Sequence, residues 1–195
     1  AAQTAQAAFR TKILFDTNQL LERVKEREQI ITVTATQLMK LLNKDMVIYL
    51  AKNEALLEPK FFAPDGKPAR REYFSDKERA VALWVLKNNK HAGATTDTLS
   101  DAQCLYLSIR TSEGVYGVIG IVMHEKPLDS FENSILLSIL GECALALENE
   151  KNAREKEEAA FLAQKEQLRA NLLRSISHDL RTPLTSISGN ASNLL

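Results

Sequence analysis

The sequence predicts an α+β fold in which an antiparallel sheet is flanked by long N- and C-terminal helices. Residues 5–42 contain neither proline nor glycine and keep the apolar spacing of a helix. Short apolar runs bounded by turn residues follow between positions 46 and 123, as expected of strands. From Asp129 a second helical pattern continues as far as Pro183.

The charge balance argues against a nucleic-acid partner. The 195-residue chain has 25 Lys and Arg residues against 25 Asp and Glu residues, so its formal net charge is zero. Its overall field therefore favours neither nucleic acid nor anionic lipid. The sequence also lacks an uninterrupted apolar run of membrane-spanning length and a signal-peptide pattern at its start, so we expect the chain itself to be soluble.

The cysteines and histidines do not have the spacing of metal ligands. Cys104 and Cys143 lie far apart in the sequence, and we interpret them as buried free thiols in a reducing cytosol rather than as a disulfide. His91 and His124 stand alone beside loops and are interpreted as surface residues. We therefore expect neither a metal ion nor a bound cofactor in this chain.

The N-terminal pattern is that of one long helix or of two abutting helices. Residues 22–28 are charged and suit an exposed or coiled-coil stretch, whereas the more apolar residues after them should dock on a globular core. A strand is expected over Met46–Ala51, and a second run from Ala55 towards Phe62 should pair with it as a hairpin.

A shorter helix should follow, with Ser75 as its N-cap and Glu78 at the third position of a capping box. Trp84 on this helix is expected to anchor the core rather than to serve as a binding platform.

Strands over Cys104–Arg110 and Val115–Met123 should form an antiparallel hairpin. Gly117 and Gly120 in the second strand indicate a bulge or the close approach of another backbone or of a ligand.

The last helix should begin with a capping box at Asp129-Ser130-Phe131-Glu132. Apolar residues from Leu136 to Leu147 would cover the sheet, and the charged run Glu150–Arg169 has a thin apolar seam suited to a two-stranded coiled coil. A helix from Asp129 to Leu195 would be about 100 Å long at 1.5 Å per residue. No small domain can bury a helix of that length, so we expect a second chain.

The stretch Ser177-His178-Asp179-Leu180-Arg181-Thr182-Pro183-Leu184 lies at the end of this pattern. Seven residues around it form one apolar stripe: Leu168, Leu172, Leu173, Ile176, Leu180, Leu184 and Ile187. At about 100° per residue, His178 points away from that stripe and is available to chemistry.

The neighbours of His178 suit it to react. The Asp179 carboxylate could hold one ring nitrogen protonated and leave the other free to attack. Thr182 shares the face of His178 one turn later. Pro183 has no N–H for the carbonyl of Asp179, so the helix should bend or loosen beside the histidine.

These eight residues resemble the phosphoacceptor motif of sensor histidine kinases, S-H-[DE]-L-R-T-P-L. The resemblance implies that His178 accepts a phosphoryl group, that Asp179 is its acid/base partner and that Thr182 positions water during dephosphorylation of a response regulator. It also implies that ATP and Mg²⁺ bind in a separate kinase domain, so that this fragment should be inactive alone. A surface histidine beside an aspartate without this motif would be an ordinary solvated residue.

The order of predicted elements is that of a GAF or PAS sensory domain, and periodicity alone does not separate the two. The segment Trp84–Leu99, with the pattern W-x-x-x-N-x-x-x-A-G-x-x-T-D-T-L, resembles the GAF domain of the KdpD family of potassium-responsive sensor kinases. We divide the chain on this resemblance into a signalling helix after the membrane region, a GAF-like domain, a coiled-coil linker and the truncated first helix of the dimerisation and phosphoacceptor domain: residues 1–28, 29–149, 150–167 and 168–195.

The resemblance further implies a homodimer through the terminal helices, a KdpE-like response regulator as partner and a potassium or osmotic response. Membrane segments of the full-length protein would hold this part on the cytoplasmic side of the bacterial inner membrane.

Two alternatives remain open from the residues. The first is a GAF module that binds a small molecule or cyclic nucleotide, for which Thr95, Thr96, Asp97 and Thr98 could form a ligand loop rather than a self-bonded turn. The second is a GAF-fold redox enzyme, which would need reactive cysteines together at one pocket.

Overall fold

The computed structural model describes the backbone of residues 2–194 and the side chains of residues 2–187. Five helical segments and six strands make up the described chain. In order they are α1 (Ala2–Arg23), α2 (Arg27–Leu42), β1 (Met46–Lys52), β2 (Ala55–Leu56), β3 (Lys60–Phe62), the 3₁₀ helix η1 (Arg71–Phe74), α3 (Asp76–Asn88), β4 (Ala92–Gly93), β5 (Cys104–Arg110), β6 (Val115–Val122) and α4 (Ser130–Leu194). The predicted α+β class is confirmed.

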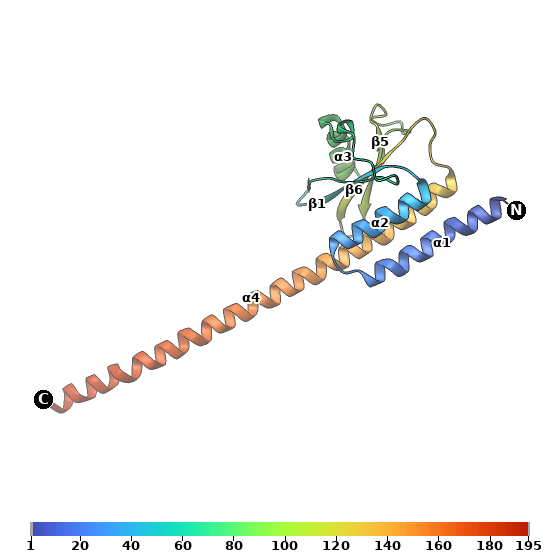
Figure 1. Cartoon of the computed structure of the whole chain (residues 1–195). Helices are drawn as coiled ribbons and strands as arrows, with labels where there is room; N and C mark the ends of the chain where they lie inside the picture. The colour runs from blue at the N-terminus through green and yellow to red at the C-terminus, as the bar shows by residue number, and fades with distance from the viewer. Residues whose placement is uncertain (1, 195) are drawn as a thin grey trace. The chain divides into compact units, whose positions relative to one another are not determined.

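The strands form one antiparallel sheet in the order β2-β1-β6-β5-β4, and β3 also pairs with β1 (Figure 1). The predicted hairpin of β5 and β6 is confirmed, with Leu107 opposite Ile119 and an irregularity at Ile109/Arg110. The predicted run from Ala55 towards Phe62 is two short strands rather than one, and each pairs with a different part of β1.

Both faces of the sheet are buried, which explains why the strands are continuous apolar runs. Ile48 and Leu107 point to the face covered by α2 and α4, on which α1 packs in turn, whereas Tyr49 and Tyr106 point to the face covered by η1 and α3. Successive side chains of a strand point to opposite faces, so a strand covered on both sides needs an apolar residue at nearly every position.

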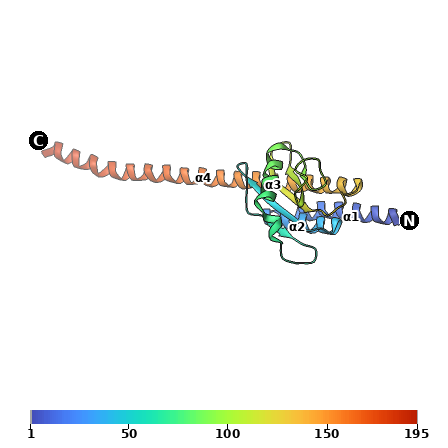
Figure 2. The ribbon, with the colours of Figure 1, turned by 90° about the horizontal axis from the view of Figure 1, so that it is seen from above.

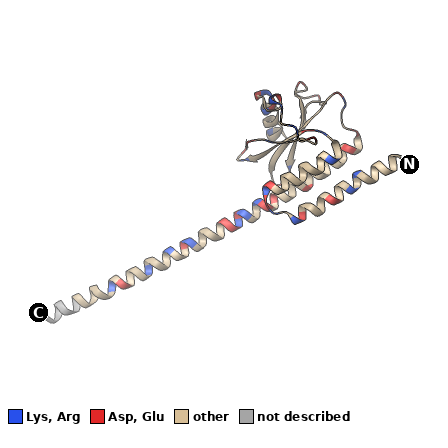
Figure 3. Cartoon of the chain, in the orientation of Figure 1, with Lys and Arg blue, Asp and Glu red and all other residues tan. Residues whose placement is uncertain are grey.

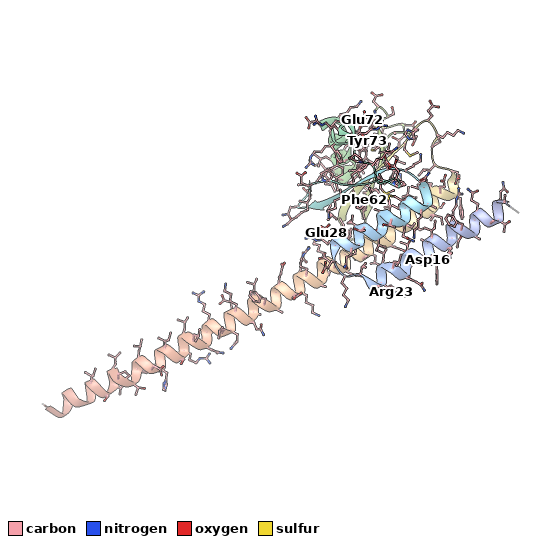
Figure 4. The ribbon with its side chains drawn as sticks, viewed as in Figure 1. Asp16, Arg23, Glu28, Phe62, Glu72 and Tyr73 are labelled. Atoms are coloured by element: carbon pink, nitrogen blue, oxygen red, sulfur yellow. The ribbon has the colours of Figure 1, made fainter. Side chains whose placement is uncertain are left out.

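The N-terminal pattern forms two helices, α1 and α2, with a break at residues 24–26. The charged stretch 22–28 is mostly exposed, as expected. Polar side chains including Asp16 and Arg23 line a shallow groove between α1 and α2, and Figure 4 labels both on α1.

The two strand glycines are explained by close approach within the chain. A Cβ at Gly117 would lie 2.5 Å from the carbonyl oxygen of Tyr49, and a Cβ at Gly120 would lie 2.5 Å from Cε1 of Tyr106. Close approach of another backbone, one of the expected alternatives, accounts for Gly117, whereas Gly120 makes room for an aromatic ring, which was not among them.

The capping residues are placed as predicted, with one difference. Asp129 Oδ1 accepts a hydrogen bond from the Glu132 N–H at 2.7 Å, and Glu132 Oε1 accepts one from the Asp129 N–H at 3.2 Å, which completes a capping box. At α3, Ser75 Oγ accepts from the Glu78 N–H, but the Glu78 carboxylate does not return the bond.

Glu78 instead enters the core, where its side chain is 2% exposed. It accepts hydrogen bonds from the N–H groups of Gln103 and Cys104 at 3.0–3.1 Å and from the Tyr106 hydroxyl at 2.9 Å. Buried carboxylates are stabilised by such donors. This residue therefore ties the first turn of α3 to the start of β5.

The chain divides into two compact units, residues 1–150 and residues 151–195, and α4 contributes to both. In the first unit, α4 buries seven residues against the sheet and its neighbouring helices: Ile135, Leu136, Ile139, Leu140, Cys143, Ala144 and Leu147. The helix contains Pro183 and continues to Leu194; Leu195 lies outside the described residues.

One described helix, α4, contains an 18-residue window apolar enough to cross a membrane, with a mean hydropathy of 1.3. In the structure 39% of that window is buried. The core helix of a soluble domain gives the same signal, and α4 packs as one in the first unit.

We expect Glu78→Ala to lower the free energy of unfolding by about 3 kcal/mol, because the Cys104 N–H and the Tyr106 hydroxyl lose a buried acceptor. Urea denaturation followed by circular dichroism measures this loss. The matched control is Glu72→Ala, an exposed carboxylate whose contact to Arg70 is 3.5 Å long, and we expect it to change stability by less than about 0.5 kcal/mol. Equal losses for the two variants would contradict a structural role of Glu78.

Candidate functional site

The predicted phosphoacceptor histidine lies on α4 in the second unit, with its ring open to solvent. The side chains of His178 and Asp179 are each 80% exposed. His178 Nδ1 and Asp179 Oδ1 are 3.9 Å apart, which is an electrostatic contact rather than a hydrogen bond. Adjacent residues of a helix do not face each other, so their side chains diverge. The structure thus places the carboxylate beside the imidazole, at a distance too long for a direct hydrogen bond.

Thr182 lies one turn after His178, as expected, and its hydroxyl donates to the backbone carbonyl of His178 at 3.2 Å. Together with Arg181, these residues and the hydroxyls of Thr185 and Ser186 line a shallow depression on the helix surface. This group of side chains offers a nucleophilic imidazole, a cation and hydroxyl groups on one side of a single helix.

Arg181 and the two later hydroxyl residues were not singled out as site residues from the sequence. Arg181 follows His178 at the third position, which is the spacing of neighbours on a helix surface, and that signal could have identified it. A guanidinium group there suits a phosphoryl group, because arginine donates charge-assisted hydrogen bonds to phosphate oxygens.

The apolar stripe is uncovered in this single chain. Every side chain of it is more than half exposed: Leu168, Leu172, Leu173, Ile176, Leu180, Leu184 and Ile187. Between residues 150 and 181, positive and negative side chains are interspersed along α4 (Figure 3). An exposed apolar face of this length on an otherwise charged helix marks an interaction surface.

The threonine-rich loop of the first unit is bonded to itself. The Gly93 N–H donates to the Thr98 carbonyl at 2.8 Å, and the Thr96 hydroxyl lies 2.7 Å from the Gly93 carbonyl oxygen. Gly93 has a φ of 96°, and a Cβ there would lie 2.1 Å from the Cys104 carbonyl oxygen, so this position needs glycine. The loop therefore forms a self-bonded turn, which is one of the two interpretations that the sequence left open.

The face of the sheet under α3 is filled by the chain's own side chains. Tyr49 and Tyr106 are 1% and 0% exposed, and the Tyr106 ring lies over Gly120. The Arg79 guanidinium lies 5.9 Å from the centre of the Tyr49 ring, and burial raises the pKa of both tyrosines. These rings occupy the space that a ligand between α3 and the sheet would need, which weighs against the small-molecule alternative at this face.

Trp84, His91 and His124 lie largely where we expected them. Trp84 packs half-buried against the cluster on the α3 side of the sheet, and His91 and His124 are exposed. Across the described residues, no group of three or more His, Cys, Asp or Glu side chains could hold a metal ion.

The two cysteines are free and buried on opposite faces of the sheet. Cys104 packs in the cluster under α3, whereas Cys143 packs between α4 and the other face. Burial raises the pKa of each thiol to about 12, with the Glu78 carboxylate adding to the effect at Cys104. Buried neutral thiols that do not share a pocket are poor redox groups, which argues against the redox alternative.

Comparison with known proteins identifies the family of this chain. The His Kinase A (phospho-acceptor) domain family matches residues 168–195, which include His178. The Sensor protein KdpD of Clostridium acetobutylicum is 33% identical to this chain over 187 residues, covering 95% of the chain. The chain belongs to the KdpD family of sensor histidine kinases. It spans about a fifth of the length of this curated relative, 21%.

Solved structures identify the fold of the first unit. The native GAF domain of the potassium sensor histidine kinase KdpD from Escherichia coli aligns with a TM-score of 0.58 at 18% identity, covering 75% of this KdpD-family chain and 98% of that one. A GAF domain from Pseudomonas syringae pv. tomato aligns with a TM-score of 0.61 at 15% identity, covering 81% and 97%. The first unit thus has the fold of a GAF domain, which periodicity alone had not distinguished from a PAS domain.

We expect neither cysteine of this KdpD-family chain to react with iodoacetamide in the folded state at mildly alkaline pH, because only the thiolate attacks and each pKa is about 12. Intact-mass spectrometry after timed labelling measures the reaction, and both thiols should react in denaturant as the matched control. Rapid native labelling of Cys104 or Cys143 would revive the redox alternative.

Proposed function

We propose that this chain is the sensory and signal-transmitting part of an ATP-dependent protein-histidine kinase in which His178 is the phosphoacceptor. One observation carries the proposal: an 80% exposed imidazole lies on the same helix that forms part of the GAF core, within the segment that matches the phospho-acceptor family. Exposure allows in-line approach of a phosphate, and a helix rooted in a sensory core can change how the imidazole is presented.

In the proposed chemistry, a neutral ring nitrogen of His178 attacks the γ-phosphorus of ATP. The new N–P bond forms as the bond from phosphorus to the ADP oxygen breaks. The Asp179 carboxylate, 3.9 Å from Nδ1, favours the positive charge that develops on the ring. Arg181 would bind phosphoryl oxygens, and Thr182 would position water for the reverse, hydrolytic activity.

ATP and Mg²⁺ would be bound by a separate kinase domain, so this chain by itself should not autophosphorylate. The phosphoryl group would then pass to an aspartate of a KdpE-like response regulator. The parts surrounding His178 suit such a docking partner, because Thr185 and Ser186 continue the same polar side of α4.

We further propose a homodimer through the terminal helices. The stripe from Leu168 to Ile187 is more than half exposed in one chain, and a second copy of the same helix would remove it from water. Membrane segments of the full-length kinase would hold this part on the cytoplasmic side of the inner membrane, where it would serve a potassium or osmotic response.

The signal would travel along α4. A change in the sensory domain or at the membrane would shift or rotate this helix, and the two dimer arrangements would present His178 differently to the kinase domain. The bend that we expect at Pro183 would assist the approach of that domain.

Phosphorylation can be tested with a version extended through the complete phosphoacceptor domain. Mixed with the isolated ATP-binding domain, labelled ATP and the response regulator, it should become labelled and pass the label on. His178→Gln should abolish labelling, because the nucleophilic nitrogen is lost. His124→Gln, an exposed histidine of the GAF domain, is the matched control and should leave labelling unchanged. Undiminished labelling of His178→Gln would refute the assignment.

Signal relay can be tested by inserting residues near Ala160 of the full-length kinase. Two residues rotate the following helix by about 200° and should uncouple phosphorylation from the stimulus. A seven-residue insertion at the same place keeps the helical face to within about 20° and should preserve regulation. Normal regulation with the two-residue insertion would exclude relay through a continuous α4.

A further inference from the structure

Helix α1 lies directly beside the first turns of α4, and the two helices run in the same direction (Figures 1 and 2). Two contacts define this parallel pairing. Arg10 contacts Asp129 at the start of α4, and Asn18, two turns later on α1, contacts Glu142 further along α4. The entering helix of the domain therefore touches the leaving helix without the sheet between them.

Arg10 makes the closest set of contacts in this pairing. Its Nη2 is 3.1 Å from Asp129 Oδ2 and 3.9 Å from Glu132 Oε2, and its guanidinium carbon lies 5.5 Å from the centre of the Phe131 ring. The Arg10 side chain is 14% exposed and that of Glu132 is 22% exposed, whereas that of Asp129 is 51% exposed. Arg10 is therefore held in place although the carboxylate of Asp129 remains open to water.

The capping box of α4 leaves one carboxylate oxygen of each of its two acidic residues available to contact Arg10. Asp129 uses Oδ1 and Glu132 uses Oε1 for the cap. Their other oxygens, Oδ2 and Oε2, face Arg10. The Glu132 N–H bond and the Arg10 charge both lower the pKa of Asp129, which keeps it ionised at neutral pH. One guanidinium thus contacts three side chains at the start of α4: Asp129, Phe131 and Glu132.

The apolar contacts of α1 specify its position along α4 less strongly than the contacts of Arg10 do. The buried residues of α1 are Ile13, Thr17 and Leu21, which recur every four residues. The Thr17 hydroxyl bonds to the Ile13 carbonyl at 2.6 Å, so its polar atom is satisfied within α1. A slip of one helical turn, about 5.4 Å, would exchange one of these side chains for the next. The same slip would replace Arg10 with Gln6 or Leu14, neither of which is charged.

We propose that Arg10 fixes the axial register of α1 against α4 and so couples displacement of the entering helix directly to the helix that continues to His178. Packed elements that have alternative registers one turn apart can act as switches, and a single charged contact then decides the register. The register function concerns this chain alone. Its consequence for signalling rests on the proposed function.

The register can be measured by disulfide trapping in this chain. Asn18→Cys with Glu142→Cys reports the observed register, because Asn18 Nδ2 and Glu142 Oε1 are 3.4 Å apart. Leu14→Cys or Glu22→Cys with Glu142→Cys reports a slip of one turn in either direction. Glu142→Cys alone controls for reaction with the buried native thiols. The readout is the ratio of slipped to observed cross-linking under mild oxidation.

We expect Arg10→Ala to raise that ratio by about threefold, as for the loss of a partly exposed ion pair. Asp129→Asn should also raise it, since asparagine keeps the cap but removes the charge. Lys12→Ala removes an exposed charge from the same helix and should leave the ratio unchanged. Circular dichroism checks that each variant folds. If Arg10→Ala does not fold, the ratios of the two single variants Asp129→Asn and Arg10→Lys are compared instead. An unchanged ratio in folded Arg10→Ala and Asp129→Asn would overturn the register role.

The signalling consequence is tested separately in the full-length kinase. Arg10→Ala should reduce the stimulus-dependent change in His178 phosphorylation at least threefold and leave basal phosphorylation intact. If the cross-linking ratio shifts while regulation is normal, the register role stands and coupling through α1 and α4 is refuted. If His178 is not phosphorylated in the unmodified kinase, the proposed function fails and the trapping result still decides the register.

Discussion

The packing of α4 against the sheet is the interaction on which the other features of this chain depend. The buried residues from Ile135 to Leu147 close one face of the sheet, and each large apolar side chain so buried contributes about 1.5–3 kcal/mol. The same helix contains His178. Helix α4 is thus both a wall of the GAF core and the element that contains the histidine, and the proposed signal relay would pass along it.

Carboxylates of the first unit hold the separate elements together at specific points. Glu78 connects α3 to β5, and Asp129 and Glu132 connect the start of α4 to α1. Glu148, near the end of the first unit, accepts hydrogen bonds from Thr111 and Tyr116 of the β5–β6 hairpin, and these bonds lower its pKa. Each of these contacts joins residues that are distant in the sequence. The charged side chains of this chain, whose net charge is zero, therefore hold elements in place and do not add up to a field that attracts a polyanion.

The elements were predictable wherever one local pattern dominates. The apolar runs of β1, β5 and β6, the Ser75 cap and the Asp129 capping box follow from side-chain period and from hydrogen bonding within one turn. The break between α1 and α2 was not decided, because residues 24–26 contain no proline or glycine. That break is made by packing, since α2 must turn back to cover the sheet. The role of Glu78 was hidden for a similar reason: its partners on β5 are more than twenty residues away.

The sequence by itself determined the family, the positions of β1, β5 and β6 and the choice of His178 as the candidate phosphoacceptor, because these depend on short motifs and on local periodicity. The tertiary structure confirmed the GAF fold that the motif resemblance implied, and it alone showed that tyrosines fill the α3 face and that Cys104 and Cys143 lie on opposite sides of the sheet. It also separated Asp179 from the ring nitrogen of His178 by 3.9 Å and brought Arg10 to the cap of α4. Such contacts depend on how helices and strands pack in three dimensions, and side-chain period along the chain does not contain that information.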